Sequence, residues 1–356
     1  MTLETALHGA SPAIGEVAGH PVVLHHGDIA AEYGAMRAGA VLVDRSARNR
    51  VRVEGPRAAE LLTGLVTSDV LALTPGQGQY GAALGPKGKI LADVRIFALA
   101  DHLLVDTSPR AAPGWLATLR KYINPRQAPY RDISSATRHI GLFGPNSRRM
   151  LSLLTGIPAD ALGALAPYAH LPVEPVEAPV TLARVPDFGV EGYEMITPSE
   201  HYADLTLRLS GMGAMPAGLL VCEIARIECG RPEWGLDMDE TTLVQEALLD
   251  TLHAVSYTKG CYVGQEVVAR VHFRGHVNRL LRGLQAADGE PLPTGSRIVD
   301  ESGKPLGDVR SSATSPRLGS IALAMVRREA EPGMAVMVED EGSPIRAELV
   351  RLPFGG

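Results

Sequence analysis

The feature that most constrains the fold is a local pattern that occurs twice along the chain. Residues 49–64 (NRVRVEGPRAAELLTG) read as an alternating strand, a Gly-Pro step and a helix that ends at Thr-Gly. Residues 138–156 (RHIGLFGPNSRRMLSLLTG) repeat this order, with a helix that is three residues longer. Proline suits the first helical turn because its missing N–H would have no partner there. The repeat predicts two related α+β units, and chance recurrence of a common pattern is the alternative.

Strand and helix signals fill both predicted units. Apolar segments at residues 79–84 and 89–97 flank the turn sequence GPKG and predict a hairpin. Residues 219–229 predict a helix that Gly230 closes, and Asp28 suits the N-cap of an earlier helix. Further strands are expected at residues 21–26, 102–106, 181–185 and 193–196.

The C-terminal part of the chain has a different character. From about Val277 the sequence consists of short alternating segments separated by turn residues, which predicts a small β-barrel or sandwich without long helices. At 356 residues the chain is too long for one ordinary core. We therefore expect α+β units at residues 1–157 and 158–276, joined by a Pro- and Ala-rich connector near residues 158–180, and a C-terminal β-barrel at residues 277–356.

Composition limits the partners and the compartment. The formal net charge of −6 argues against direct nucleic-acid binding, which normally needs a basic surplus. Three cysteines without framework spacing indicate free thiols in a reducing compartment. No apolar segment approaches the length of a membrane span, and the N-terminus lacks the pattern of a secretion signal. The sequence therefore predicts a cytoplasmic protein without a membrane partner.

One cysteine lies in an unusual setting, the segment TKGCYVGQE at residues 258–266. Cys261 is flanked by Gly260 and Gly264, and we expect a helix to begin near Cys261. A helix N-terminus and the nearby Lys259 would both favour the thiolate, which is the nucleophilic form of cysteine. The alternative is a small buried thiol between glycines that packing requires.

The same segment resembles a known family. Residues 259–266 (KGCYVGQE) match the K-G-C-Y-x-G-Q-E signature of the YgfZ family, folate-binding proteins related to the T-protein (aminomethyltransferase) of the glycine cleavage system. Further similar stretches are VTSDV (66–70), GYE (192–194), ARIECGRPEWGLDMD (225–239), SGKPLGDV (302–309) and IALAMV (321–326). The resemblance implies two related α+β units and a C-terminal β-barrel around a central cavity for tetrahydrofolate or a derivative.

The resemblance also implies residues that hold the folate. Glu194 matches the acid that pairs with the amino-pyrimidine edge of the pterin, and a solvated strand carboxylate is the alternative. Arg226 matches an arginine that faces the folate, whereas a simple pairing with Glu223 on one helix would be structural. Aromatic positions of the family pattern that could flank the rings are Tyr80, Tyr193 and Trp234.

The chain departs from the T-protein pattern where that pattern has paired acids. In the segment GKILADV (88–94) only Asp93 remains of the pair, and Asp106 replaces an asparagine expected after the next strand. Asp93 is thus the candidate carboxylate for one-carbon transfer, with Asp106 as a second candidate contact to the cofactor. The loss of one acid leaves open whether the chain catalyses a reaction.

Two main functions follow, and they belong to different classes. The first is a YgfZ-type accessory protein that supports assembly or repair of iron–sulfur enzymes and, through them, tRNA modification, with Cys261 as the functional thiol and Lys259 beside it. The alternative is a tetrahydrofolate-dependent aminomethyltransferase. A weaker third hypothesis is a cysteine hydrolase that uses His272 or His276 as a base. No metal site is expected, because a cluster normally needs four cysteine ligands and C-x-x-C spacing is absent.

Overall fold

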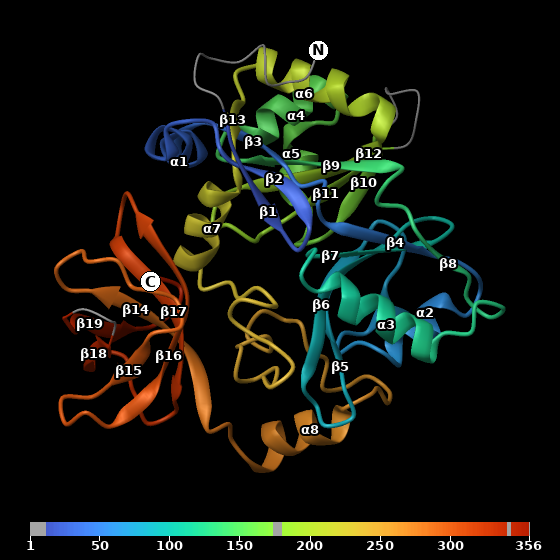
Figure 1. Cartoon of the computed structure of the whole chain (residues 1–356). Helices are drawn as coiled ribbons and strands as arrows, with labels where there is room; N and C mark the ends of the chain where they lie inside the picture. Colours follow the sequence, from blue (N-terminus) through green and yellow to red (C-terminus); the bar gives the residue numbers. More distant parts are fainter. Residues whose placement is uncertain (1–11, 174–179, 340–342, 356) are drawn as a thin grey trace.

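The computed structural model describes residues 12–173, 180–339 and 343–355. Figure 1 shows three bodies: two mixed units of helices and sheet, and a barrel beside them. The fold class predicted from the sequence is confirmed, because the two α+β units are followed by a closed six-stranded C-terminal barrel.

The first unit is built on a five-stranded antiparallel sheet with the strand order β5-β6-β7-β4-β8. Its strands are β4 (Asn49–Val53), β5 (Gly78–Leu84), β6 (Ile90–Ala98), β7 (Leu103–Thr107) and β8 (Tyr130–Asp132). Its helices are α2 (Ala58–Thr63), the short 3₁₀ turn η2 (Val70–Ala72) and α3 (Ala112–Tyr122). One face of the sheet forms the core of the unit, where Trp115 and Leu119 of α3 are fully buried against Val51 and Val105.

The second unit has a six-stranded sheet with the order β10-β11-β12-β9-β3-β13. Its strands are β3 (Val41–Asp44), β9 (Thr137–Phe143), β10 (His170–Val173), β11 (Val180–Arg184), β12 (Gly192–Pro198) and β13 (Met215–Ala217). Its helices are α1 (Ile29–Ala38), α4 (Ser147–Thr155), α5 (Ala159–Ala164), η3 (Ser199–His201) and α6 (Tyr202–Gly211). As predicted, the Asp28 side chain caps α1 by accepting a hydrogen bond from the Ala31 N–H.

The predicted repeat appears in the topology. In each unit a strand leads through Gly-Pro into a helix, and three further strands follow in the chain. The last of these three pairs with the strand that precedes the helix, which gives the orders β5-β6-β7-β4 and β10-β11-β12-β9. Gly55 and Gly144 both have positive φ, +94° and +126°. A Cβ at Gly144 would lie 2.5 Å from the Gly39 carbonyl oxygen, so only glycine fits that turn.

The composition of the two sheets does not follow the predicted domain boundary at residue 157. Strands β3 and β9 precede that position, yet both belong to the second sheet, where β9 pairs with β12. The predicted connector contains α5 and β10, and its residues 174–179 lie outside the described part of the chain. The domain boundaries remain a proposal, and we place β3 and β9 with the second unit.

The C-terminal unit is a closed barrel with the strand order β14-β17-β16-β15-β18-β19. Its strands are β14 (Arg279–Ala286), β15 (Arg297–Val299), β16 (Pro305–Ser315), β17 (Gly319–Arg327), β18 (Ala335–Glu339) and β19 (Ile345–Val350). The last helix of the described residues is α8 (Gln265–Arg274), so the expectation of a β-rich segment without long helices is confirmed there. Each helix that the structure describes is too short or too polar to cross a membrane.

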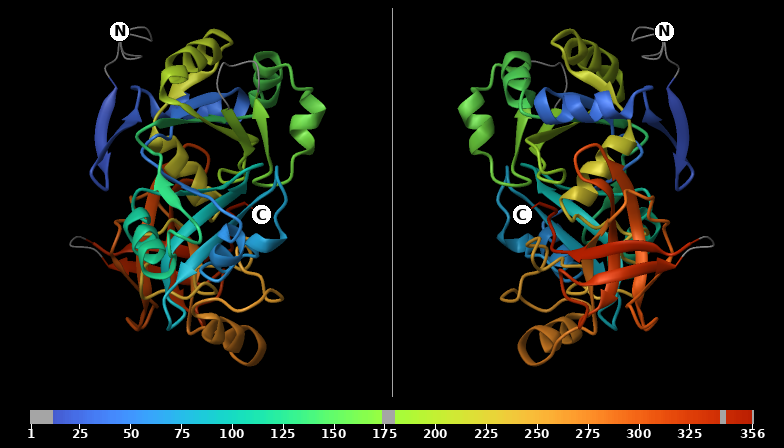
Figure 2. Two further views of the ribbon diagram at one scale, coloured as in Figure 1. Left: turned by 90° about the vertical axis from the view of Figure 1, so that its right-hand side faces the viewer. Right: turned by 90° about the vertical axis from the view of Figure 1, so that its left-hand side faces the viewer.

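Helix α7 (Leu219–Glu228) lies between the second unit and the barrel in Figure 1. Its last residue, Glu228, accepts hydrogen bonds from the hydroxyls of Tyr33 on α1 and Ser315 on β16. The hairpin of β1 (Ala13–Val17) and β2 (His20–His25) packs against α7 and stands at the edge of the molecule in Figure 2. Helix α7 therefore joins elements from both ends of the chain.

Candidate functional site

One face of the first sheet carries polar side chains toward the second unit. Strand register places Tyr80 opposite Arg95, and Arg95 opposite Asp106. Directly opposed residues on neighbouring strands share a sheet face, and so do residues two apart on one strand, which adds Asp93 to this group. The Tyr80 hydroxyl donates a hydrogen bond of 2.9 Å to Asp93 Oδ2. The hairpin predicted from the sequence thus brings two candidate site residues together.

The second sheet completes a buried network of charges. Glu194 Oε2 lies 2.8 Å from both Arg95 Nη2 and His139 Nε2. Arg48 pairs with Asp106 at 2.7 Å, and Arg95 also contacts Asp106. The surrounding arginines and His139 hold the pKa of Glu194 well below its ordinary value, although burial acts in the opposite direction. Such a network ties the two sheets together at the centre of the molecule.

A small cavity of about 50 Å³ lies beside this network. Tyr80, Asp93, Asp187, Arg226 and Arg231 are among the residues that line it. Asp93 Oδ1 is buried and has no hydrogen-bond partner within the described part of the chain. Burial raises the pKa of Asp93, while the Tyr80 hydrogen bond and nearby arginines oppose that shift. An unpartnered carboxylate oxygen at a buried cavity can accept a proton or a hydrogen bond from a ligand.

A larger cavity of about 310 Å³ adjoins the first, since Arg45, Arg48, Ser108 and Glu233 line both. All three units contribute to its walls, together with the N-terminal hairpin. Apolar side chains come from the hairpin and α7, and the barrel contributes polar residues. These residues are Val22, Leu24, Leu219, Leu220, Arg310, Ser311 and Ser312. The paired cavities therefore offer a polar inner end and a partly apolar outer part, which suits a ligand with a flat polar head and a longer tail.

The predicted folate contacts have different environments. Glu194 is 1% exposed and already surrounded by cations, and Arg226 pairs with Glu223 at 2.7 Å and with Asp237 at 2.7 Å. Arg226 lines the small cavity, and its pairing with Glu223 is the one weighed as the structural alternative. Asp106 is fully buried between Arg48 and Arg95. Direct contact of these side chains with a folate stays a prediction.

Tyr193 and Trp234, two of the aromatic residues expected to flank the folate, make their polar contacts with other protein groups. Tyr193 packs in the core of the second unit, and its hydroxyl donates to Glu191 at 2.9 Å. This placement follows from strand alternation, because its neighbour Glu194 points to the opposite face. Trp234 is partly buried and its indole N–H donates to the Ile90 carbonyl at 3.3 Å. Their predicted role of flanking a ligand stays untested.

The cysteine segment differs from the expectation. Helix α8 was expected to begin near Cys261; it begins at Gln265, four residues later, so Cys261 precedes the first turn of the helix. Gly264 is the N-cap with φ +83°, and a Cβ there would lie 2.7 Å from the Gly85 carbonyl oxygen. Cys261 is exposed, as the functional hypothesis requires. Lys259 is buried and donates to the carbonyls of Thr63 and Val66.

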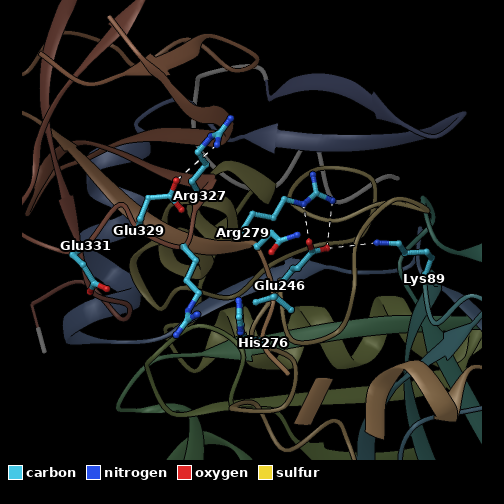
Figure 3. A pocket seen from close by; sticks show the side chains of 10 residues that line it. Lys89, Glu246, His276, Arg279, Arg327, Glu329 and Glu331 are labelled. Atoms are coloured by element: carbon cyan, nitrogen blue, oxygen red, sulfur yellow. Dashed lines mark hydrogen bonds and ion pairs between the residues drawn. The ribbon is translucent and has the colours of Figure 1, made fainter. Parts of the chain in front are cut away.

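A further cavity, of about 760 Å³, is lined by Lys89, Glu246, the residues that follow α8 and the barrel. Figure 3 shows the side chains that line it. Lys89 and Arg279 both point toward Glu246, at 3.9 Å and 3.0 Å. Arg327 pairs with Glu329 at 3.8 Å. His276, one of the two bases considered for a hydrolase, lines this cavity. The other, His272, stacks on Tyr257 with 3.6 Å between ring centroids.

Sequence reasoning missed several residues of the central site: Arg95, His139, Tyr168, Asp187 and Arg231. A signal existed for Arg95, because an arginine inside a mostly apolar strand needs a buried partner. The others lie on segments that meet only in the folded chain.

The fold and the central cavity define a class: three-unit proteins whose repeated α+β halves and barrel enclose a polar ligand site. The sequence pattern of the GCVT N-terminal domain matches residues 11–257, and that of the glycine cleavage T-protein C-terminal barrel domain matches residues 279–355. The chain belongs to the glycine cleavage T-protein family. The predicted relation to T-proteins is thereby confirmed, whereas membership of the YgfZ branch remains a proposal. Members of this family use tetrahydrofolate, in agreement with the predicted cofactor.

Individual relatives are similar over nearly their full length. An aminomethyltransferase of Saccharopolyspora erythraea is 30% identical, with 99% of this chain and 97% of the relative covered. An aminomethyltransferase of Streptomyces coelicolor is 31% identical, with 98% and 96% covered. The crystal structure of glycine cleavage system aminomethyltransferase T from Bartonella henselae has a TM-score of 0.86 at 24% identity, covering 96% of this chain and 94% of that one. That structure shows the shared fold.

Proposed function

We propose that this protein is a tetrahydrofolate-dependent one-carbon transferase of the aminomethyltransferase type. The observation that carries the proposal is the Oδ1 atom of Asp93 at the inner cavity, which is buried and has no hydrogen-bond partner among the described residues, while Oδ2 is fixed by the Tyr80 hydroxyl. Membership of the T-protein family and the names of the relatives support it.

The residues present suit a reduced folate. Its pterin head is flat and polar, and the two adjoining cavities of about 50 and 310 Å³ are lined by carboxylates, arginines and apolar side chains. When bound, the folate supplies the nitrogen atoms that accept the one-carbon unit. Asp93 Oδ1 is placed to hold or accept a proton from a ligand nitrogen, and the Tyr80 hydrogen bond keeps the carboxylate in one orientation. The surrounding protein shields this oxygen from bulk solvent.

The proposal is tested with purified protein, tetrahydrofolate and an aminomethylated carrier protein as the donor. Formation of methylenetetrahydrofolate that depends on all three components is the expected result. Titration calorimetry with tetrahydrofolate alone measures binding separately from chemistry. A folded protein that binds tetrahydrofolate but forms no product would contradict the transferase proposal.

A second candidate function rests on a separate observation, the exposed thiol of Cys261 within the KGCYVGQE segment. We propose it as the YgfZ-type role, in which a folate-binding protein supports iron–sulfur client or assembly proteins in the cytoplasm, and tRNA modification through them. Burial raises the pKa of Cys222 to about 12 and that of Cys229 to about 11, so Cys261 is the thiol best placed to react.

This second role has its own test. Iodoacetamide should label the folded protein at Cys261 first, and Cys261→Ser should abolish support of iron–sulfur enzymes in a deletion strain while folate binding is kept. Cys229→Ser is the matched control, because that thiol is less exposed. Full complementation by Cys261→Ser would leave the transferase as the function of the chain.

A further inference from the structure

Arg231 packs on the ring of Tyr80, whose hydroxyl bonds to Asp93, and the T-protein resemblance did not single it out. It follows Gly230, which has a φ of +68° after the end of α7. The Arg231 N–H donates to the Arg226 carbonyl at 2.8 Å and the Gly230 N–H to the Ile227 carbonyl at 2.9 Å, which is a Schellman motif. This reversal directs Arg231 away from the helix and across the cavity to the first sheet.

The guanidinium of Arg231 is fixed on several sides. Its Cζ lies 4.4 Å from the centroid of the Tyr80 ring and 5.9 Å from that of Tyr168. It pairs with Asp187 at 3.0 Å and donates to the Tyr168 hydroxyl, which itself donates to Asp187 at 2.9 Å. Only 12% of the side chain is exposed. A cation held over a ring in this way restrains both the ring and the charge.

The other charged groups around Asp93 are mostly engaged elsewhere. Arg48 and Arg95 pair with Asp106, and Arg45 approaches Glu194 at 3.5 Å. A separate group at the cavity wall consists of Arg226, Glu223, Glu233 and Arg110, in which the arginines pair with the acids. Arg231 shares Asp187 with Arg95, so two arginines face one carboxylate there. Arg231 is the arginine of this group that packs on the Tyr80 ring.

We propose that Arg231 is a positioning residue for Asp93: it clamps the Tyr80 ring so that the Tyr80 hydroxyl stays on Oδ2, and it places a positive charge at the wall of the same cavity. The proposal deepens the transferase function and rests on it for its catalytic meaning. The arrangement of Tyr80, Asp93 and Arg231 can also be tested without any substrate. Burial raises the pKa of Asp93, whereas the hydrogen bond from Tyr80 and the charges of Arg48 and Arg231 lower it.

The test compares Arg231→Met, which removes the charge, with Arg231→Lys, which keeps it. The ionisation of Asp93 is followed by carboxyl infrared spectra as a function of pH, with Asp93→Asn as the reference that identifies the band. The midpoint of Asp93 ionisation should rise by roughly one pH unit in Arg231→Met, which loses the cation, and by less than about half a unit in Arg231→Lys, which keeps it. If both variants keep the wild-type midpoint, the proposal is overturned.

Activity adds a second measurement. In Arg231→Met the rate of methylenetetrahydrofolate formation should fall roughly tenfold on the acid side of the pH profile and less than about threefold on its alkaline plateau. A loss that is equal at every pH would indicate a merely structural role and overturn the proposal. If Arg231→Met does not fold, Tyr168→Phe is used instead, because it removes a hydrogen-bond partner of Arg231 and keeps the aromatic ring. An unchanged midpoint of Asp93 ionisation in that variant would overturn the proposal. A wild-type protein without activity would contradict the transferase function, whereas the infrared midpoints would still decide the role of Arg231.

Discussion

At the scale of single residues, Lys259 shows how structure changes the meaning of a motif. The sequence suggested that its charge activates Cys261, but its ammonium group donates to the carbonyls of Thr63 and Val66 and lies 4.5 Å from the centroid of the Tyr262 ring. These carbonyls lie at the end of α2 and just beyond it. Lys259 therefore anchors the cysteine segment to the first unit.

We expect Lys259→Met to lower the free energy of unfolding by about 1.5–3 kcal/mol, because it removes two hydrogen bonds from a buried charged donor. Urea denaturation measures the change, and Lys87→Met is the control because Lys87 is exposed. An unfolding free energy equal to that of the control variant would show that Lys259 has no anchoring role.

At the scale of elements, the barrel is held to the second unit through the end of α7. Glu228 is 4% exposed, and its carboxylate accepts hydrogen bonds from the hydroxyls of Tyr33 and Ser315. Arg317 pairs with the same carboxylate at 3.2 Å. The Phe354 N–H also donates to the Glu228 carbonyl at 2.8 Å. One residue thus connects α1, α7 and the barrel.

Glu228→Gln should reduce the free energy of unfolding by about 1–3 kcal/mol, because the amide leaves buried donors with a poorer acceptor. The matched control is Glu331→Gln on the exposed rim of the barrel. Urea unfolding followed by circular dichroism provides the comparison. Equal stability of the two variants would contradict a joining role for Glu228.

At the scale of the whole molecule, the buried network between the two sheets makes stability depend on pH. Burial lowers the pKa of His139 below its ordinary value of 6.5, although Glu194 acts in the opposite direction. Below pH 6.5 the unfolded chain binds a proton at this histidine while the folded protein does not. Stability therefore falls as the pH drops through this window, until the folded protein also becomes protonated.

The contribution of His139 should reach a slope of at most about 1.4 kcal/mol per pH unit. His139→Gln should flatten the dependence of unfolding free energy on pH between pH 6.5 and 5, and the exposed His276→Gln serves as the control. Measurement needs only urea titrations at several pH values. A variant that keeps the wild-type slope would show that His139 is not the titrating group.

The sequence predicts local structure and the barrel better than it predicts contacts between units. The Gly-Pro repeats, the Tyr80–Asp93 hairpin and the C-terminal strands depend on neighbours in the chain, and each was predicted. The pairing of β3 with β9 and the meeting of Arg95 with Glu194 join segments about a hundred residues apart, for which periodicity gives no signal. Helix α8 is capped at Gly264, whose positive φ and close approach to the Gly85 carbonyl only glycine allows, and that approach is not visible in the local sequence.

In the proposed transferase, the Asp93 carboxylate at the inner cavity carries the chemistry. Its most direct test is the rate of methylenetetrahydrofolate formation by Asp93→Asn, compared with the wild type and with Asp288→Asn at an exposed position of the barrel. The amide keeps the size of the side chain but cannot accept a proton, so we expect a loss of roughly 100-fold or more in kcat. Tetrahydrofolate binding should change much less. An Asp93→Asn protein with the rate of the Asp288→Asn control would contradict the assignment of Asp93 as the catalytic carboxylate.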